Sequence, residues 1–329
     1  MAEVVQTKKK IALLHRHTPD QIQETNAAFR YLKDRVDVLT FKTFDRTSKW
    51  KFLKDILWMF YAPMLVFWKG YDVIYLDDSI PFYPIFVKLA SPRSKVILRL
   101  GDFHLMYYTS GILYNFLHFF EKIGWRMADE IISISEPMRD YVGRGKVVLD
   151  PVDHKDFPIN GSQNHGTVMF HGLLTKNKNV DILLEAAKLL QSVNFVIIGD
   201  GPDCQRLEKI APHNVFFKGW IPHKNIHRYI ATCAVGVALR SDNPGNEYVV
   251  TSPFLQYGVM GKPCLVTRRK VFGDYLWQFE DVEELVIKIK ALLVVPGFSE
   301  SEGQKLREYI LKNHDAERIA EEIWSVLSS

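Results

Sequence analysis

A chain of 329 residues with 47% hydrophobic and 24% charged residues is typical of a folded globular protein, and its length predicts two domains of about 150 residues each. The net charge of +4 permits contact with anionic ligands or lipid surfaces but is too small to indicate nucleic-acid binding. The three cysteines, Cys204, Cys233 and Cys264, are too widely spaced for a disulfide framework or a metal cluster and fit a reducing cytosolic setting. We expect no signal peptide, and no apolar run reaches the roughly 20 residues needed to cross a bilayer.

The first half of the chain alternates short apolar runs with helical segments. Strands are predicted at residues 11–14, 36–41, 72–77, 95–100, 130–135 and 146–149, with helices that include 21–33 and 113–128. Polar residues follow two of these strands. His15, Arg16 and His17 form either a solvated turn or a substrate-facing loop, whereas Asp102 and His104 lie where a parallel sheet places its ligands, so we expect them in a cleft.

The segment Lys49–Lys69 mixes tryptophans, phenylalanines and lysines around most of a helix. Its uninterrupted apolar part, residues 56–68, contains Pro63 and is too short to span a membrane. Two interpretations stay open, a helix packed in the core of the first domain and a helix in the lipid interface with its lysines near head groups. The mixture of tryptophan and lysine favours the second.

The second half restarts after a polar linker at residues 150–166. Its predicted strands, at 167–171, 195–198, 215–217, 235–239 and 264–267, read as continuous apolar runs, each closely followed by Gly, Pro or Asn, as in a buried parallel sheet. Helices are predicted at 281–293, 304–312 and 316–327. Lys178 follows a glycine turn and precedes a helix, which is the place an anion requires. Asp200 is expected to shape its Gly-Asp-Gly-Pro turn through backbone hydrogen bonds.

The order of several motifs resembles that of the GT-B glycosyltransferases, in particular the large retaining family 4. The motifs are residues 128–135 with 152–157, Phe170-His-Gly172, 181–186, Gly199-Asp-Gly-Pro202, Phe217-Lys-Gly219 and 256–263. The resemblance implies an α/β fold of two Rossmann-like α/β/α domains that face each other across a cleft. The first, residues 1–152, lies on the acceptor side and the second, 153–312, holds the nucleotide-sugar donor, while a final helix at 313–329 crosses back to the first.

The resemblance also implies roles for individual residues. The base of the donor lies near Gly219–Ile221, the diphosphate near Gly172 and Lys178, and the ribose near Gln256, while Asp102 or His104 touches the transferred sugar. The predicted catalytic residues are Asp102, His104 and Glu247. The predicted donor-binding residues are Gly172, Lys178, Gly201, Trp220, Ile221, Arg240, Thr251, Ser252 and Gln256.

The chain departs from the family pattern at several of these positions. Leu173 stands where an arginine usually pairs with the lysine, and Lys176, Arg240 and Arg268 are candidates to replace it. Gln256 stands where the family usually has the glutamate that holds the ribose. Tyr248 stands where the family has a second, partner glutamate, and Glu247 is the nearest carboxylate. A glycine pair expected after the first strand is replaced by residues 15–17.

These features predict a glycosyltransferase that moves a sugar from a nucleoside-diphosphate sugar to the hydroxyl of a glycan or lipid-linked acceptor. The resemblance implies that the enzyme retains anomeric configuration and needs no metal or other cofactor. We expect it in the cytoplasm, peripheral on the membrane face through Lys49–Lys69, with no nucleic-acid partner. Two alternatives stay open, a catalytically silent binding subunit, which the departures above favour, and a nucleotide-sugar epimerase. A dehydrogenase is disfavoured, because no Gly-x-Gly-x-x-Gly follows the first strand.

Overall fold

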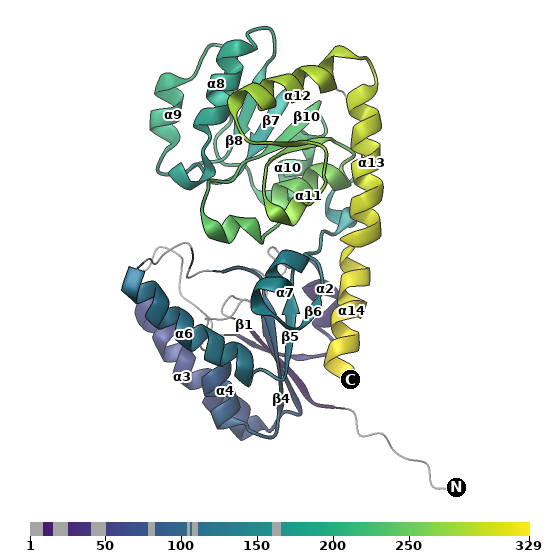
Figure 1. Cartoon of the computed structure of the whole chain (residues 1–329). Helices are drawn as coiled ribbons and strands as arrows, with labels where there is room; N and C mark the ends of the chain where they lie inside the picture. The colour runs from purple at the N-terminus through teal and green to yellow at the C-terminus, as the bar shows by residue number, and fades with distance from the viewer. Residues whose placement is uncertain are drawn as a thin grey trace, which may run out of the picture. The chain divides into compact units, whose positions relative to one another are not determined.

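The chain folds into two compact units, residues Met1–Pro151 with Ala316–Ser329, and residues Val152–Asp315. A computed structural model describes residues 9–15, 26–40, 51–77, 83–103, 106, 111–159 and 166–329, apart from the side chains of residues 40, 51–56, 58, 59 and 177. Each unit is built on its own parallel sheet covered by helices (Figure 1). The expected α/β fold class of two Rossmann-like units is therefore confirmed.

The first unit contains a six-stranded parallel sheet with the strand order β2-β1-β3-β4-β5-β6. Its strands are β1 (Ile11–His15), β2 (Asp37–Thr40), β3 (Val73–Asp77), β4 (Lys95–Leu100), β5 (Glu130–Ser133) and β6 (Lys146–Val147). Its helices are α2 (Phe29–Leu32), α3 (Lys51–Lys69), α4 (Tyr83–Ala90), α6 (Gly111–Met127), α7 (Glu136–Val142) and α14 (Ala316–Ser328).

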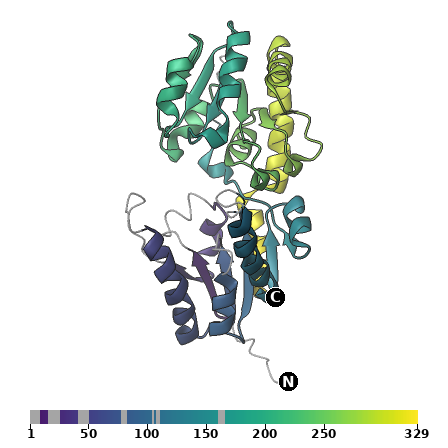
Figure 2. The same ribbon diagram turned by 60° about the vertical axis from the view of Figure 1, so that its left-hand side comes forward.

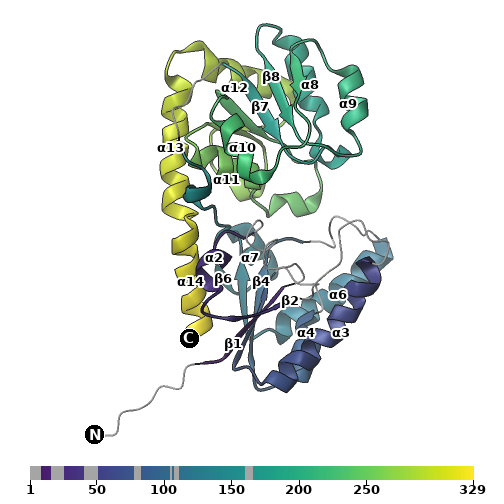
Figure 3. The ribbon, with the colours of Figure 1, turned by 180° about the vertical axis from the view of Figure 1, so that it is seen from behind.

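Successive side chains along the strands point to opposite faces of the sheet, and helices cover both faces. Leu13 and Tyr75 face the side on which α2 and α14 lie, where they pack in one cluster with Ile319 and Ile323. On the opposite side α3, α4 and α6 lie side by side, as the front and rear views agree (Figures 1 and 3). Within the part of the chain described, no helix is long and apolar enough to cross a membrane.

The second unit contains a six-stranded parallel sheet with the order β12-β11-β10-β7-β8-β9. Its strands are β7 (Val168–His171), β8 (Phe195–Ile198), β9 (Val215–Phe217), β10 (Val235–Ala238), β11 (Cys264–Thr267) and β12 (Gln278–Phe279). Its α-helices are α8 (Asp181–Leu189), α9 (Cys204–Ile210), α10 (His223–Ile230), α11 (Ser252–Val259), α12 (Val282–Val294) and α13 (Phe298–Asn313). Short 3₁₀ helices are η1 (His154–Asp156), η2 (Lys176–Lys178), η3 (Pro244–Glu247) and η4 (Lys270–Phe272).

The sheet of the second unit lies between two helix layers (Figures 1 and 2). Val168 and Phe170 face α8 and α12, whereas Met169, between them in sequence, faces the cluster formed by α11 and α13. The core is thus continuous on both sides of the sheet, which leaves the loops at the strand ends as the place for a site.

Two helices differ from the sequence prediction. The helix expected at 21–33 is found only as α2 among the described residues, and 21–25 lie outside them. The helix expected at 304–312 begins earlier, at Phe298. Its first turns pack closely on the chain after α11, where a Cβ at Gly303 would stand 2.0 Å from the carbonyl oxygen of Gly261.

Candidate functional site

The candidate site lies at the carboxyl ends of the strands in the second unit. From β7 the sheet continues to β8 and β9 on one side and to β10, β11 and β12 on the other. The order of the strands therefore reverses between β7 and β10. In open parallel sheets such a switch point opens a crevice for ligands.

Three strand-end turns at this edge are joined by backbone hydrogen bonds. The amide of Gly172 donates to Ile198, the amide of Leu174 to Asp200 and the amide of Gly199 to Gly219, each with an N···O distance of 2.9 Å. A Cβ at Gly199, where φ is +140°, would lie 1.9 Å from the carbonyl oxygen of Gly172. The close approach requires glycine, and it holds the turns after β7, β8 and β9 as one backbone surface.

The carboxylate of Asp200 adds to this surface. Its Oδ1 accepts a hydrogen bond of 2.7 Å from the amide of Gly201, one of the predicted donor-binding residues. The turn-shaping role expected for Asp200 is therefore confirmed.

Lys178 is the last residue of η2, three residues before α8 begins at Asp181, and is half-buried. Next to the turn, His171 is buried, and its Nε2 has no hydrogen-bond partner among the described residues. Burial, together with the neighbouring His223 and Lys178, lowers the pKa of His171 to about 3. His171 is therefore neutral at physiological pH and offers an unused ring nitrogen beside a cation; from the sequence it could either donate to a phosphate or simply end its strand, and the second interpretation was favoured.

Gln256 is brought to the same edge by α11. Thr251 caps this helix, accepting a hydrogen bond of 3.3 Å from the amide of Phe254 through Oγ1, and Ser252 is its first residue. The buried Gln256 amide nitrogen lies 3.0 Å from His223 Nε2, at the start of α10. The structure thus places Gln256 next to His223, which follows the loop that carries Trp220 and Ile221. The sequence did not indicate this contact.

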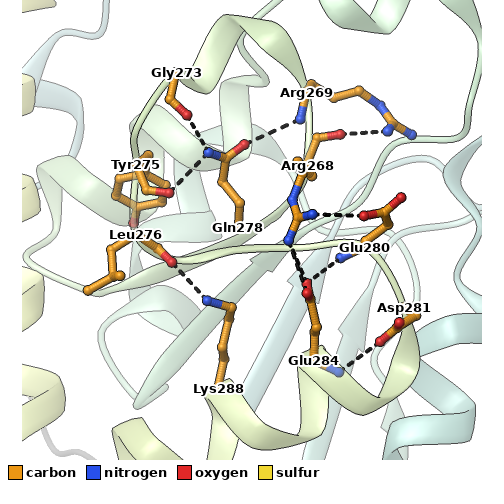
Figure 4. Close-up of polar contacts among 10 residues, drawn as sticks. All are labelled: Arg268, Arg269, Gly273, Tyr275, Leu276, Gln278, Glu280, Asp281, Glu284 and Lys288. Atoms are coloured by element: carbon orange, nitrogen blue, oxygen red, sulfur yellow. Dashed lines mark hydrogen bonds and ion pairs between the residues drawn. The ribbon is translucent and has the colours of Figure 1, made fainter.

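The arginines after β10 and β11 differ in their ion-pair and hydrogen-bond partners. Arg268 Nη1 lies 2.8 Å from Glu280, and its Nη2 lies 2.9 Å from Glu284, as Figure 4 shows. Arg240 donates to the Asn246 side chain at 3.2 Å, and its Nε has no hydrogen-bond partner within the described ranges. Of the three candidates to replace the missing arginine, Arg268 is already neutralised by two carboxylates.

Arg269 is the residue of this group that sequence reasoning missed. Its guanidinium donates to the carbonyl of Arg240 at 3.0 Å and to Asp242 at 2.8 Å, and so connects the loops after β10 and β11. Glu247 belongs to the same connection, because its Oε2 accepts a 3.0 Å bond from the amide of Lys270 and its Oε1 lies 3.9 Å from Arg269 Nε. These contacts give Glu247 a loop-joining function, and its catalytic role stays a prediction.

In the first unit, Asp102 follows β4 and accepts a 2.8 Å hydrogen bond from the amide of Phe103. His104 lies outside the described residues. A buried network at this sheet edge was not indicated by the sequence: Arg99 lies 3.0 Å from Asp77 and 2.5 Å from Asp150. The signal available was that Asp77 and Arg99 stand within apolar strands, where a charge requires a partner.

The two units, each with a six-stranded parallel sheet, define the class of the protein as the GT-B fold. Across 98% of this chain and 100% of that chain, it is similar to HepE of Anabaena in complex with UDP and glucose, with a TM-score of 0.69 and 16% identity. It is likewise similar to sucrose-phosphate synthase of Thermosynechococcus elongatus, with a TM-score of 0.75 and 14% identity over 97% and 98% of the two chains.

Residues 165–295 match the family model of the Glycosyl transferases group 1. A curated relative, the lipopolysaccharide core biosynthesis glycosyltransferase LpsE of Rhizobium meliloti (strain 1021), is 26% identical over 237 residues, which cover 68% of this chain. The match spans 62% of the length of that relative. The resemblance to the GT-B glycosyltransferases is confirmed, while the narrower assignment to family 4 stays a prediction.

Proposed function

We propose that the protein transfers a sugar from a nucleoside-diphosphate sugar to an acceptor hydroxyl. The observation that carries the proposal is the surface formed by the hydrogen-bonded turns at Gly172, Gly199 and Gly219. It presents backbone beside Lys178 and the unpartnered Nε2 of His171, within the segment that matches the family model.

Each part of this surface has a chemical use in such a transfer. Backbone amides and the Lys178 ammonium would stabilise the negative charge that develops on the leaving diphosphate. Gln256 would hydrogen-bond ribose hydroxyls while neighbouring His223. Asp102, His104 and Glu247 remain the proposed catalytic residues, and retention of configuration without a metal remains part of the proposal.

The comparisons support a choice of donor and acceptor to test first. HepE was solved with UDP and with UDP-glucose, and LpsE acts in lipopolysaccharide core biosynthesis. We therefore propose a UDP-sugar as donor and a lipid-linked glycan as acceptor, with the protein on the cytoplasmic membrane face through Lys49–Lys69.

A thermal-shift assay with UDP, GDP, ADP and dTDP, with and without EDTA, tests the donor site. A ligand that binds only the native state stabilises it by about 2.7 kcal/mol at a concentration of 100 times its Kd. We expect one nucleotide to raise the unfolding midpoint, EDTA to leave the shift unchanged, and Lys178→Ala to abolish it. Lys290→Ala is the matched control, because Lys290 is an exposed lysine on α12, away from the strand-end turns.

The outcomes separate the proposal from its alternative. A folded wild-type protein that shows no shift with any of the four nucleotides contradicts the donor site. A shift without sugar transfer or donor hydrolysis identifies the protein as the silent binding subunit. That alternative is favoured by the replacement of the family's usual arginine and glutamate by Leu173 and Gln256.

A further inference from the structure

Helix α3 turns its large apolar side chains outward. Ala62 and Val66 are completely buried on its inner face. The exposed side chains have fractional exposures between 44% and 76% and recur every three or four residues as one stripe: Leu57, Phe60, Tyr61, Met64, Phe67 and Trp68. This stripe is therefore not packed in the core of the first unit, whereas Ala62 and Val66 are, and the lipid-interface interpretation of Lys49–Lys69 stays a prediction.

Helix α6 also exposes large apolar side chains. It exposes Ile112, Phe116 and Phe119, with Ile112 at 89%, on the i, i+4, i+7 spacing of one helix face. Its inner face buries His118, Glu121, Gly124 and Trp125, and His118 Nδ1 lies 2.8 Å from the Glu121 carboxylate. The sequence predicted an apolar helix at 113–128 but did not indicate which of its side chains would be exposed.

The two stripes belong to one layer. Helix α4 contacts both α3 and α6, and the three helices lie side by side in views from opposite sides (Figures 1 and 3). Between the stripes, α4 exposes Leu89 at 69%, and Phe86 lies edge-on to Phe60 with ring centroids 5.7 Å apart. A monomeric protein seldom exposes an apolar surface drawn from three helices unless the surface binds something.

The charges of this layer indicate what it binds. The three helices contain six lysines and arginines, Lys51, Lys54, Lys69, Lys88, Lys122 and Arg126, and two carboxylates, Asp55 and Glu121. Lys88 is paired with Asp129 at 2.6 Å, which leaves five of the six to oppose Asp55. Glu121 is buried, so it does not oppose an anionic partner. Lysine is depleted at protein–protein interfaces, whereas lysine and arginine beside tryptophan and phenylalanine are typical of surfaces that lie in a lipid interface.

We infer that the outer face of α3, α4 and α6 docks on an anionic bilayer surface. Phe67, Trp68 and Phe116 enter the boundary between head groups and acyl chains, and Lys69 and Lys122 contact lipid phosphates. The inference deepens the peripheral location proposed above and rests on it, and it adds α6 as half of the docking surface.

Co-sedimentation of the full chain with vesicles tests the inference. Wild-type protein should bind phosphatidylcholine vesicles that contain phosphatidylglycerol and bind phosphatidylcholine alone more weakly. The α6 variant Ile112→Ser/Phe116→Ser/Phe119→Ser and the α3 variant Phe60→Ser/Phe67→Ser/Trp68→Ser should each lower the partition coefficient at least about tenfold.

The double variant Ile287→Ser/Val294→Ser is the matched control, because it removes apolar side chains of similar exposure, 65% and 72%, from α12 in the other unit. It should bind vesicles like the wild type. Because all the substituted side chains are exposed, each variant should fold like the wild type. Circular dichroism verifies this.

Two results would overturn the inference. One is a wild-type protein that ignores anionic vesicles, and the other is an α6 variant that binds them as well as the wild type does. If sedimentation velocity instead shows that the substitutions dissociate an oligomer while no form binds vesicles, the face binds a second copy. The assay uses no nucleotide sugar, so vesicle binding without a nucleotide shift refutes the transferase alone, and a nucleotide shift without vesicle binding refutes the surface alone.

Discussion

Gly199→Ala is the substitution that most directly tests the joined turns. The residue has φ +140°, and a Cβ there would lie 1.9 Å from the carbonyl oxygen of Gly172 and 3.0 Å from its carbonyl carbon. The obstacle is backbone, so no side chain can rotate away to make room.

The cost follows from what must move. An alanine at this φ is strained by about 1–3 kcal/mol. Separating the turns also disrupts the hydrogen bonds from Gly172 to Ile198 and from Gly199 to Gly219, each contributing about 1 kcal/mol. The total is about 3–5 kcal/mol, which corresponds to a fall in Tm of roughly 6–20 °C for a unit of this size.

Gly297→Ala is the matched control. Gly297 belongs to the same unit and has φ +79°, but a Cβ there meets nothing within 4 Å. Only the conformational cost of about 1–2 kcal/mol applies. Thermal unfolding followed by circular dichroism compares the two variants, with nucleotide binding as a second readout. If Gly199→Ala unfolds within a degree or two of Gly297→Ala and still binds nucleotide, the turns do not act as one surface.

Three further predictions concern charge and hydrogen bonding in the second unit. Because the pKa of His171 is about 3 in the fold against 6.5 when unfolded, the unfolded chain binds a proton that the native state does not, so the free energy of unfolding decreases as the pH is lowered from 6.5 to about 3. In urea titrations at several pH values, His171→Gln should reduce that slope by about 1.4 kcal/mol per pH unit, and an unchanged slope would contradict the burial argument. Arg268→Gln should cost less than about 1 kcal/mol and leave the nucleotide-dependent Tm shift intact, because its ion pairs are exposed; loss of the shift would make Arg268 a donor ligand. Gln256→Ala should weaken nucleotide binding about tenfold in isothermal titration calorimetry by removing its hydrogen-bonding amide beside His223, and an unchanged Kd would exclude the ribose role.

The sequence by itself determined the elements whose signals are local. The strands Phe195–Ile198, Val215–Phe217 and Cys264–Thr267 have the predicted bounds, because a strand buried on both faces reads as an uninterrupted apolar run. Helix α7 begins after Ser135, which caps it, and carries Pro137 in its first turn, as a local signal also predicts. The turns after β7, β8 and β9 could also be located from the local sequence, because their glycines can be identified without knowledge of the tertiary structure.

Other features depend on which distant residues come together. Nothing in Arg268-Arg269 distinguishes the arginine held by Glu280 and Glu284 from the one that joins two loops, because the partners come from separate elements. The pairing of Gln256 with His223 is likewise made by packing α11 beside α10, and the sequence predicted a role for Gln256 only through a family resemblance.

The outward faces of α3 and α6 were decided by tertiary structure alone. Both helices are apolar around most of their circumference, so periodicity cannot tell which side meets the sheet. Packing places Ala62 and Val66 of α3 inside, while Phe67 and Trp68 remain outside. Local sequence therefore determined that these segments are helices, whereas the neighbours that each helix met on folding determined which side chains were left for a partner.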